Sequence, residues 1–135
     1  MMFPITALYG SLCGLLVLVL AAQVVRQRRR FKIGIGSGSE HSLKRAIRVH
    51  SNAIEYIPIA LLLLALFEAN QGNGYLAHSM GMVLVIGRVL HAQGLGSNPG
   101  TSFGRFWGTL LTWLAILVLS IANLSQFFVD GKMPL

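Results

Sequence analysis

Charged residues are scarce in this 135-residue chain, and acidic residues are scarcer still. Asp, Glu, Lys and Arg together make up 11% of the sequence, and only four residues are acidic. Soluble globular domains carry about 25% charged residues, so the deficit argues against a water-soluble protein. Cysteine is nearly absent too: Cys13 is the only one. A single cysteine excludes an intrachain disulfide.

Hydrophobic residues make up 54% of the sequence and gather in four runs, at residues 4–25, 53–69, 75–90 and 106–129. A membrane-spanning helix needs about 20 mostly apolar residues. The first and last runs reach that length alone, and the middle two reach it with their polar ends. We therefore expect an all-α integral membrane bundle of up-down topology. It forms one domain over residues 1–135, with helices at about 4–30, 41–70, 75–93 and 102–129.

The basic residues are unevenly distributed along the chain. Of eleven Lys and Arg residues, eight lie between Arg26 and Arg48, around the first expected loop. Such an excess marks the cytoplasmic side of membrane proteins, so the first and third loops should face the cytoplasm and both termini should lie outside. We expect membrane lipids, and no nucleic acid, as partners. The charges follow the first apolar run, which argues against a signal peptide.

Polar side chains lie on one face of the second expected helix. At about 100° per residue, Arg45, Arg48, Asn52, Glu55 and Tyr56 fall within about 100° of arc. Each ionisable group inside a membrane segment costs about 2.5–3.5 kcal/mol on insertion scales, so such groups mark candidate functional sites. On the third helix Arg88 and His91 are three residues apart and share a face.

The chemistry of these residues suits a small zwitterionic ligand. The guanidinium of Arg48 can bind a carboxylate in a bidentate manner, Glu55 can bind an ammonium group, and Asn52 both donates and accepts hydrogen bonds. A small peptide carries all the complementary groups. A structural alternative is that Arg48, Glu55 and Arg88 pair only with one another. The histidines lack the spacing of metal ligands, so we expect no metal site.

The same residues carry a resemblance to a known family. The pattern Arg48-x-x-x-Asn52-x-x-Glu55-Tyr56-x-Pro58 resembles the signature of the membrane-associated proteins in eicosanoid and glutathione metabolism, the MAPEG family. A second match is GRVLHAQG at residues 87–94, and the basic residues that close the first helix are a weaker third. The resemblance spans most of the chain, which looks like a short bacterial member similar to the microsomal glutathione transferases.

Membership of that family implies a homotrimer that binds glutathione, as a co-substrate, between neighbouring subunits. The resemblance implies that Arg105 or Arg29 stabilises the glutathione thiolate. In the third helix His91 and Leu95 stand where the family has tyrosines. Carried over by motif position, the implied glutathione-binding residues are Arg48, Asn52, Glu55, Tyr56, Arg88 and His91.

The implied activity is that of a glutathione-dependent transferase or peroxidase of the bacterial inner membrane. Its substrates would be lipophilic electrophiles or lipid hydroperoxides that arrive through the bilayer. Two other interpretations remain open. A small proton-coupled exporter would use Glu55 as its intramembrane carboxylate. A non-catalytic membrane protein would bind a lipid headgroup or a partner, and the polar residues of the second helix would then be structural.

Overall fold

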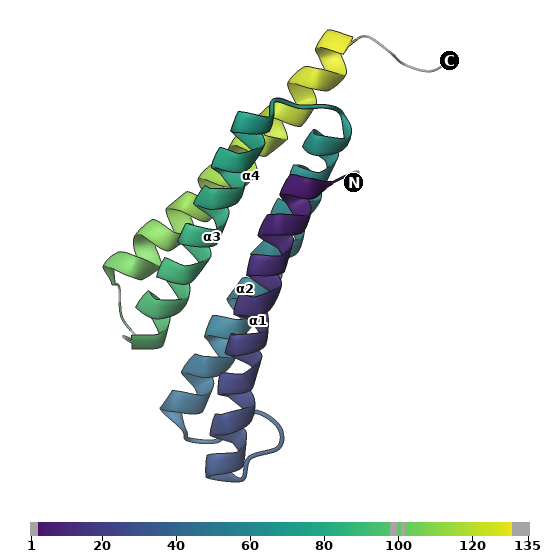
Figure 1. The fold of residues 1–135 in the computed structure, drawn as a ribbon. Coiled ribbons are helices and arrows are strands. Elements are labelled where there is room, and N and C mark those ends of the chain that lie inside the picture. Colours follow the sequence, from purple (N-terminus) through teal and green to yellow (C-terminus); the bar gives the residue numbers. More distant parts are fainter. Residues whose placement is uncertain (1–2, 98–99, 101, 131–135) are drawn as a thin grey trace.

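Four long helices run side by side and alternate in direction, so the expected up-down arrangement is present (Figure 1). The structure, a computed structural model, describes residues 3–97, 100 and 102–130. The start of the first helix and the end of the last lie at the same end of the bundle as the turn between the second and third (Figure 1). The helices are α1 (Pro4–Phe31), α2 (His41–Ala69), α3 (Gly74–Ser97) and α4 (Phe103–Asp130).

The helix bounds agree with the expected ones within one residue, with a single exception. The expected third helix stops at residue 93, whereas α3 continues to Ser97. Gly94 and Gly96 do not break it. Gly94 lies against the first turn of α4, where a Cβ atom would overlap the backbone of Gly104 and Arg105. This contact explains why the last turn of α3 tolerates glycine, which costs about 1 kcal/mol relative to alanine inside a helix.

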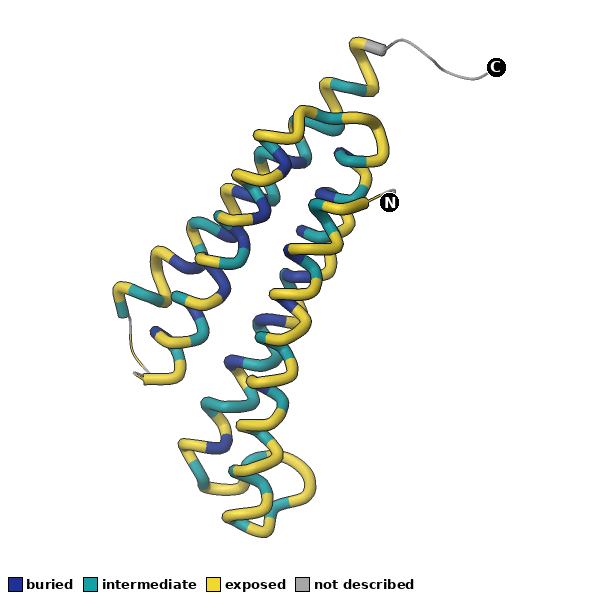
Figure 2. The backbone as a smooth tube through the Cα atoms, in the orientation of Figure 1, coloured by how far each residue is buried: buried dark blue, intermediate teal, exposed yellow. Residues whose placement is uncertain are grey.

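Each helix is long enough and apolar enough to cross a membrane. At 1.5 Å per residue, the 28 residues of α1 span about 42 Å, more than the roughly 30 Å of a bilayer's hydrocarbon core. Buried residues line the inner sides of the helices, and exposed residues cover the outer sides (Figure 2). Many of the exposed residues are large and apolar, as expected for contact with lipid or with another subunit, including Leu15, Leu18, Leu62, Leu117 and Ile121.

The bundle consists of two helix pairs. α1 packs on α2 and α3 packs on α4, while α2 also contacts both α3 and α4. The interior holds two apolar clusters. Polar contacts join α2 to α1 at the end of the bundle where α1 begins. The carboxylate of Glu68, near the end of α2, accepts hydrogen bonds from the backbone N–H groups of Ile5 (2.9 Å) and Thr6 (2.8 Å). An acidic group at a helix N-terminus is stabilising because free N–H groups and the helix dipole favour it there.

Candidate functional site

A cavity of about 620 Å³ opens between the first half of α2, the last turns of α3 and the first turn of α4. No carboxylate is among the residues that line it, whereas four permanently cationic side chains are, so its wall is strongly basic. The lining residues are His41, Lys44, Arg45, Arg48, Asn52, His91, Leu95 and Arg105.

Arg88 is buried next to the cavity and holds residues of its wall in place. Its side chain is only 1% exposed, and its Nη2 donates a hydrogen bond to Oδ1 of Asn52 at 2.7 Å. The same Nη2 lies 3.1 Å from Nδ1 of His91. Because a guanidinium only donates, His91 accepts through Nδ1, which leaves its Nε2 as the N–H group. The guanidinium also lies over the ring of Tyr56, 5.8 Å from the ring centre.

This arrangement assigns a positioning role to Arg88. It links Asn52 and Tyr56, one turn apart on α2, to His91 on its own helix. Charge-assisted hydrogen bonds are stronger than neutral ones, and a buried guanidinium needs partners. The result is a fixed polar wall in which Asn52 and His91 line the cavity, whereas Tyr56 and Arg88 are not among the lining residues.

Glycines bring Arg105 to the cavity. A Cβ atom at Gly104 or Gly108 of α4 would overlap the backbone of α3 near Leu90 and His91, so the two helices approach at backbone distance. Ser102 caps α4: its Oγ accepts a hydrogen bond from the N–H of Arg105 (3.3 Å) and donates one to the carbonyl of Gly94 (2.9 Å). Local capping and close packing therefore place Arg105 beside the last turns of α3.

Arg45 fixes the opposite side of the cavity. Its Nη1 donates to the carbonyl oxygens of Gly96 (3.2 Å) and Ser97 (3.3 Å) at the end of α3. A cation at a helix C-terminus satisfies free carbonyl groups and complements the helix dipole. Arg45 thus joins the start of α2 to the end of α3 and closes the basic wall.

Glu55 occupies a different position from its neighbours on the motif. It is exposed and does not line the cavity, although it lies two helical turns from Arg48. Glu55 makes no ion pair with Arg48 or Arg88 within the described ranges. Arg88 instead makes its hydrogen bonds to Asn52 and His91. The structural alternative, in which Arg48, Glu55 and Arg88 pair with one another, is therefore wrong within one subunit.

The two candidates for thiolate stabilisation are far from equivalent. Arg105 lines the cavity, and its Nη1 donates a long hydrogen bond to the carbonyl of Gly100 (3.4 Å). Arg29 is exposed near the end of α1 and is not among the lining residues. In a single subunit the structure therefore brings Arg48, Asn52, His91 and Arg105 together and leaves Arg29 outside.

Sequence reasoning missed two lining residues, His41 and Lys44. Both belong to the first turn of α2, which precedes the apolar run and is read from the sequence as a solvated helix end. Lys44 is four residues before Arg48 and seven before Ser51, so the spacing that places it on the face of Arg48 was present. Across the described part of the chain no group of three His, Cys, Asp or Glu side chains is arranged to hold a metal ion.

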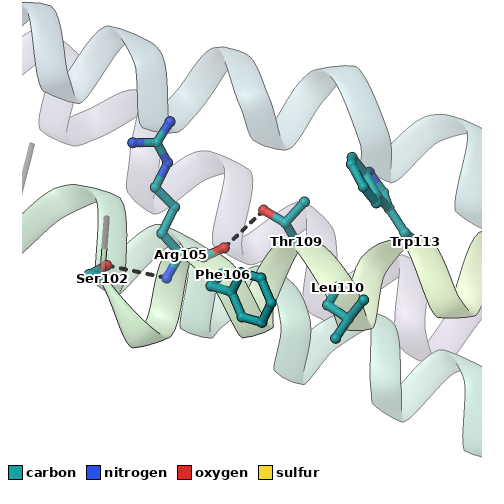
Figure 3. Close-up of a pocket in the computed structure, with 6 residues that line it drawn as sticks. All are labelled: Ser102, Arg105, Phe106, Thr109, Leu110 and Trp113. Carbon is teal, nitrogen blue, oxygen red and sulfur yellow. Dashed lines mark hydrogen bonds between the residues drawn. The ribbon is translucent and has the colours of Figure 1, made fainter. Parts of the chain in front are cut away.

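A second, mostly apolar groove of about 370 Å³ runs along α4 from the same arginine. Figure 3 shows Phe106 and Leu110 on one side of α4 and Arg105 and Trp113 on the other. Trp113 is 54% exposed. Arg105 lines both the basic cavity and this groove. Its charged side chain therefore lies at the boundary between the polar cavity and the apolar groove. The groove is lined by Ser102, Arg105, Phe106, Thr109, Leu110 and Trp113.

Comparison with known proteins identifies the family of this chain. The sequence model of the MAPEG family matches residues 6–125. The chain is 38% identical over 120 residues to the inner membrane protein YecN of Escherichia coli K12, covering 89% of this chain and 90% of that protein. The same values hold for YecN of Escherichia coli O6:H1. With four apolar helices and this likeness, the chain is a multi-pass membrane protein, and it belongs to the MAPEG family.

Proposed function

We propose that this protein is a glutathione-dependent transferase or peroxidase that acts on lipophilic electrophiles in the membrane. The observation that carries the proposal is the basic cavity, in which four cations and Asn52 converge from α2 and α4. Glutathione has two carboxylates and one ammonium group, so its net charge is negative. A cavity of about 620 Å³ lies within the range of about 300–1,000 Å³ for small-molecule sites.

The residues divide the recognition of glutathione between them. Arg48 and Arg45 bind its carboxylates, because guanidinium groups match carboxylates in a bidentate geometry. Asn52, held by Arg88, hydrogen-bonds the peptide. A cation exporter would need a carboxylate in the cavity, and none lines it. The basic end of the bundle faces the cytoplasm in this proposal and draws the anionic ligand from that side.

Glu55 completes the site from the boundary between subunits. An exposed carboxylate on a membrane-spanning helix is costly against lipid, and another copy of the chain would cover it. We therefore propose a homotrimer in which the ammonium group of glutathione binds Glu55 at the edge of the cavity. Glutathione then lies between neighbouring subunits.

Arg105 is the residue proposed to stabilise the thiolate. A free thiol has a pKa of about 8.5 and is only a few per cent ionised at neutral pH. Lowering that pKa by about 2 units requires roughly 2.7 kcal/mol, which one guanidinium in a partly dry site can supply. The thiolate sulfur then attacks the electrophilic carbon, a C–S bond forms, and the leaving group departs with its electron pair.

The groove along α4 suits the apolar part of the second substrate. It starts at Arg105, where the thiolate is formed, and continues over Leu110 to Trp113. With a lipid hydroperoxide, the thiolate would attack the terminal oxygen, the O–O bond would break, and the lipid alkoxide would leave and take up a proton. A second glutathione would then attack the sulfur of the resulting glutathione sulfenic acid, forming the disulfide and releasing water. The products are then the lipid alcohol, water and oxidised glutathione.

The test compares the two arginines directly. The purified protein is mixed with glutathione, and the ultraviolet absorbance of the bound thiolate is followed against pH in wild type, Arg105→Leu and Arg29→Leu. We expect Arg105→Leu to raise the pKa of the bound thiol and to lower the rate of conjugation to an aryl halide more than tenfold. A normal thiolate signal in Arg105→Leu would exclude the assigned role, and loss only in Arg29→Leu would transfer the role to Arg29.

A further inference from the structure

A second, smaller pocket lies beside the basic cavity, at the end of the bundle where α1 finishes and α2 begins. It has a volume of about 140 Å³, is partly open, and is lined by residues of α1, α2 and the last turn of α3. Among the described residues, Arg45 is the only one that lines both this pocket and the larger cavity. Its lining residues are Gln23, Arg26, Gln27, Ser42, Arg45, Ala46, Val49 and Gly96.

The pocket offers an excess of hydrogen-bond donors. Arg26 from α1 and Arg45 from α2 bring two positive charges, and no carboxylate is among the lining residues. Among the described residues the Nε of Arg45 has no hydrogen-bond partner and is buried, while its Nη1 donates to the carbonyls of α3. Ser42 contacts Gln27 only weakly, at 3.5 Å. The exposed guanidinium of Arg26 and the hydroxyl of Ser42 can both donate hydrogen bonds to an anion in the pocket.

The depth of the pocket in the membrane indicates which anions can reach it. Residues 4–25 contain no charged side chain, and at 1.5 Å per residue they span about 33 Å, close to the thickness of the hydrocarbon core. Arg26 is the first charge after that run and lines the pocket. The pocket therefore lies at the level where the hydrocarbon core meets the headgroups, which is where lipid phosphates are located.

The size of the pocket sets a further limit. A volume of about 140 Å³ corresponds to about five water molecules, at about 30 Å³ each in the liquid. A phosphate group with part of its hydration shell fits this space, whereas a tripeptide needs more room. Ala46 and Val49 form an apolar part of the wall, which suits the glycerol side of a phosphodiester.

We propose that this pocket binds a phosphate group, held between Arg26 and Arg45, and that an anionic phospholipid supplies it. The same chemistry would accept free phosphate. The bound phosphate ties the end of α1 to the start of α2 and holds the Arg45 side chain that also forms the wall of the larger cavity. The site shares Arg45 with the proposed glutathione site but is otherwise lined by different residues, and its test involves no glutathione.

The experiment measures thermal unfolding of the full chain in detergent with three additives: dioleoylphosphatidylglycerol, phosphatidylcholine and inorganic phosphate. The variant is Arg26→Gln, and the charge-matched control is Arg30→Gln, an exposed residue on the same helix that does not line the pocket. We expect phosphatidylglycerol, but not phosphatidylcholine, to stabilise the wild type. Arg26→Gln removes a hydrogen bond between two charged groups, so it should weaken the apparent affinity for phosphatidylglycerol about tenfold. Arg30→Gln should weaken it much less.

Each outcome decides the proposal. Stabilisation by phosphatidylglycerol that is lost in Arg26→Gln supports the site and identifies lipid as the source. Stabilisation by inorganic phosphate alone, lost in the same variant, supports the site with free phosphate as its ligand. Equal losses in Arg26→Gln and Arg30→Gln would show only general charge attraction, and no response to either anion would leave no phosphate site; both results overturn the proposal.

Discussion

At the scale of single residues, the candidate site depends on a buried arginine that points away from solvent. Arg88 holds Asn52 and His91 in place through the same Nη2 atom. The spacing of the motif predicted that Arg48 and Asn52 share a site, and the structure brings both to one cavity. The motif did not predict that Glu55 lies outside the cavity. A helical wheel shows which side of its own helix a residue is on, but it does not show which neighbouring helix packs against that side.

Replacing Asn52 with alanine tests the role of Arg88. The change removes the acceptor 2.7 Å from Nη2 and leaves the buried guanidinium with His91. Leaving a buried charged donor short of a partner costs about 1–3 kcal/mol, so the thermal unfolding temperature in detergent should fall. Ser51→Ala, at the adjacent half-buried position, is the control. Equal unfolding temperatures for the two variants would contradict the structural role given to Arg88.

At the scale of secondary-structure elements, the contact between α3 and α4 positions the site. The sequence predicted four helices from hydrophobic run length, and their bounds follow closely. It placed the end of the third helix too early, because three glycines and a proline in residues 94–100 favour a break. A single sequence does not show that Gly94 fits against the backbone of a partner helix, which is a property of the packed pair.

Alanine substitutions at Gly94 and Gly96 are a matched pair of variants that tests the contact between α3 and α4. In Gly94→Ala the new methyl group would overlap the backbone at Arg105, whereas at Gly96 nothing lies within 4 Å of the added Cβ. Overpacking of this kind costs about 1–3 kcal/mol. We expect Gly94→Ala to unfold at lower temperature and to bind glutathione more weakly, while Gly96→Ala behaves as wild type or slightly better. The prediction fails if the two variants melt together.

At the scale of the whole molecule, one subunit leaves polar groups exposed on helices that cross a membrane. Arg48 and Glu55 of α2 are both exposed, and the apolar run that follows them is suited to lipid. Hydropathy and the motif predicted the membrane bundle, but the partner that covers Glu55 cannot be read from one chain. In the proposal above a second subunit completes the site, and the homotrimer is the assembly that we propose.

The oligomeric state is measured by native mass spectrometry of protein released from detergent micelles. We expect a species of three subunits, and we expect Glu55→Leu to keep this assembly while losing affinity for glutathione, since the proposed role of Glu55 is to bind the ligand's ammonium group. A monomer at all accessible concentrations would contradict the proposal that a neighbouring subunit covers Glu55.

The central claim is that the basic cavity binds glutathione, and isothermal calorimetry on the purified protein tests it most directly. Wild type should bind glutathione with a dissociation constant between micromolar and millimolar. Arg48→Ala, which removes a charged group from the cavity wall, should weaken binding at least about tenfold. Arg30→Ala, a charge-matched change outside the cavity, should leave binding unchanged. No heat of binding with wild type, or the same affinity in Arg48→Ala and Arg30→Ala, would contradict the account.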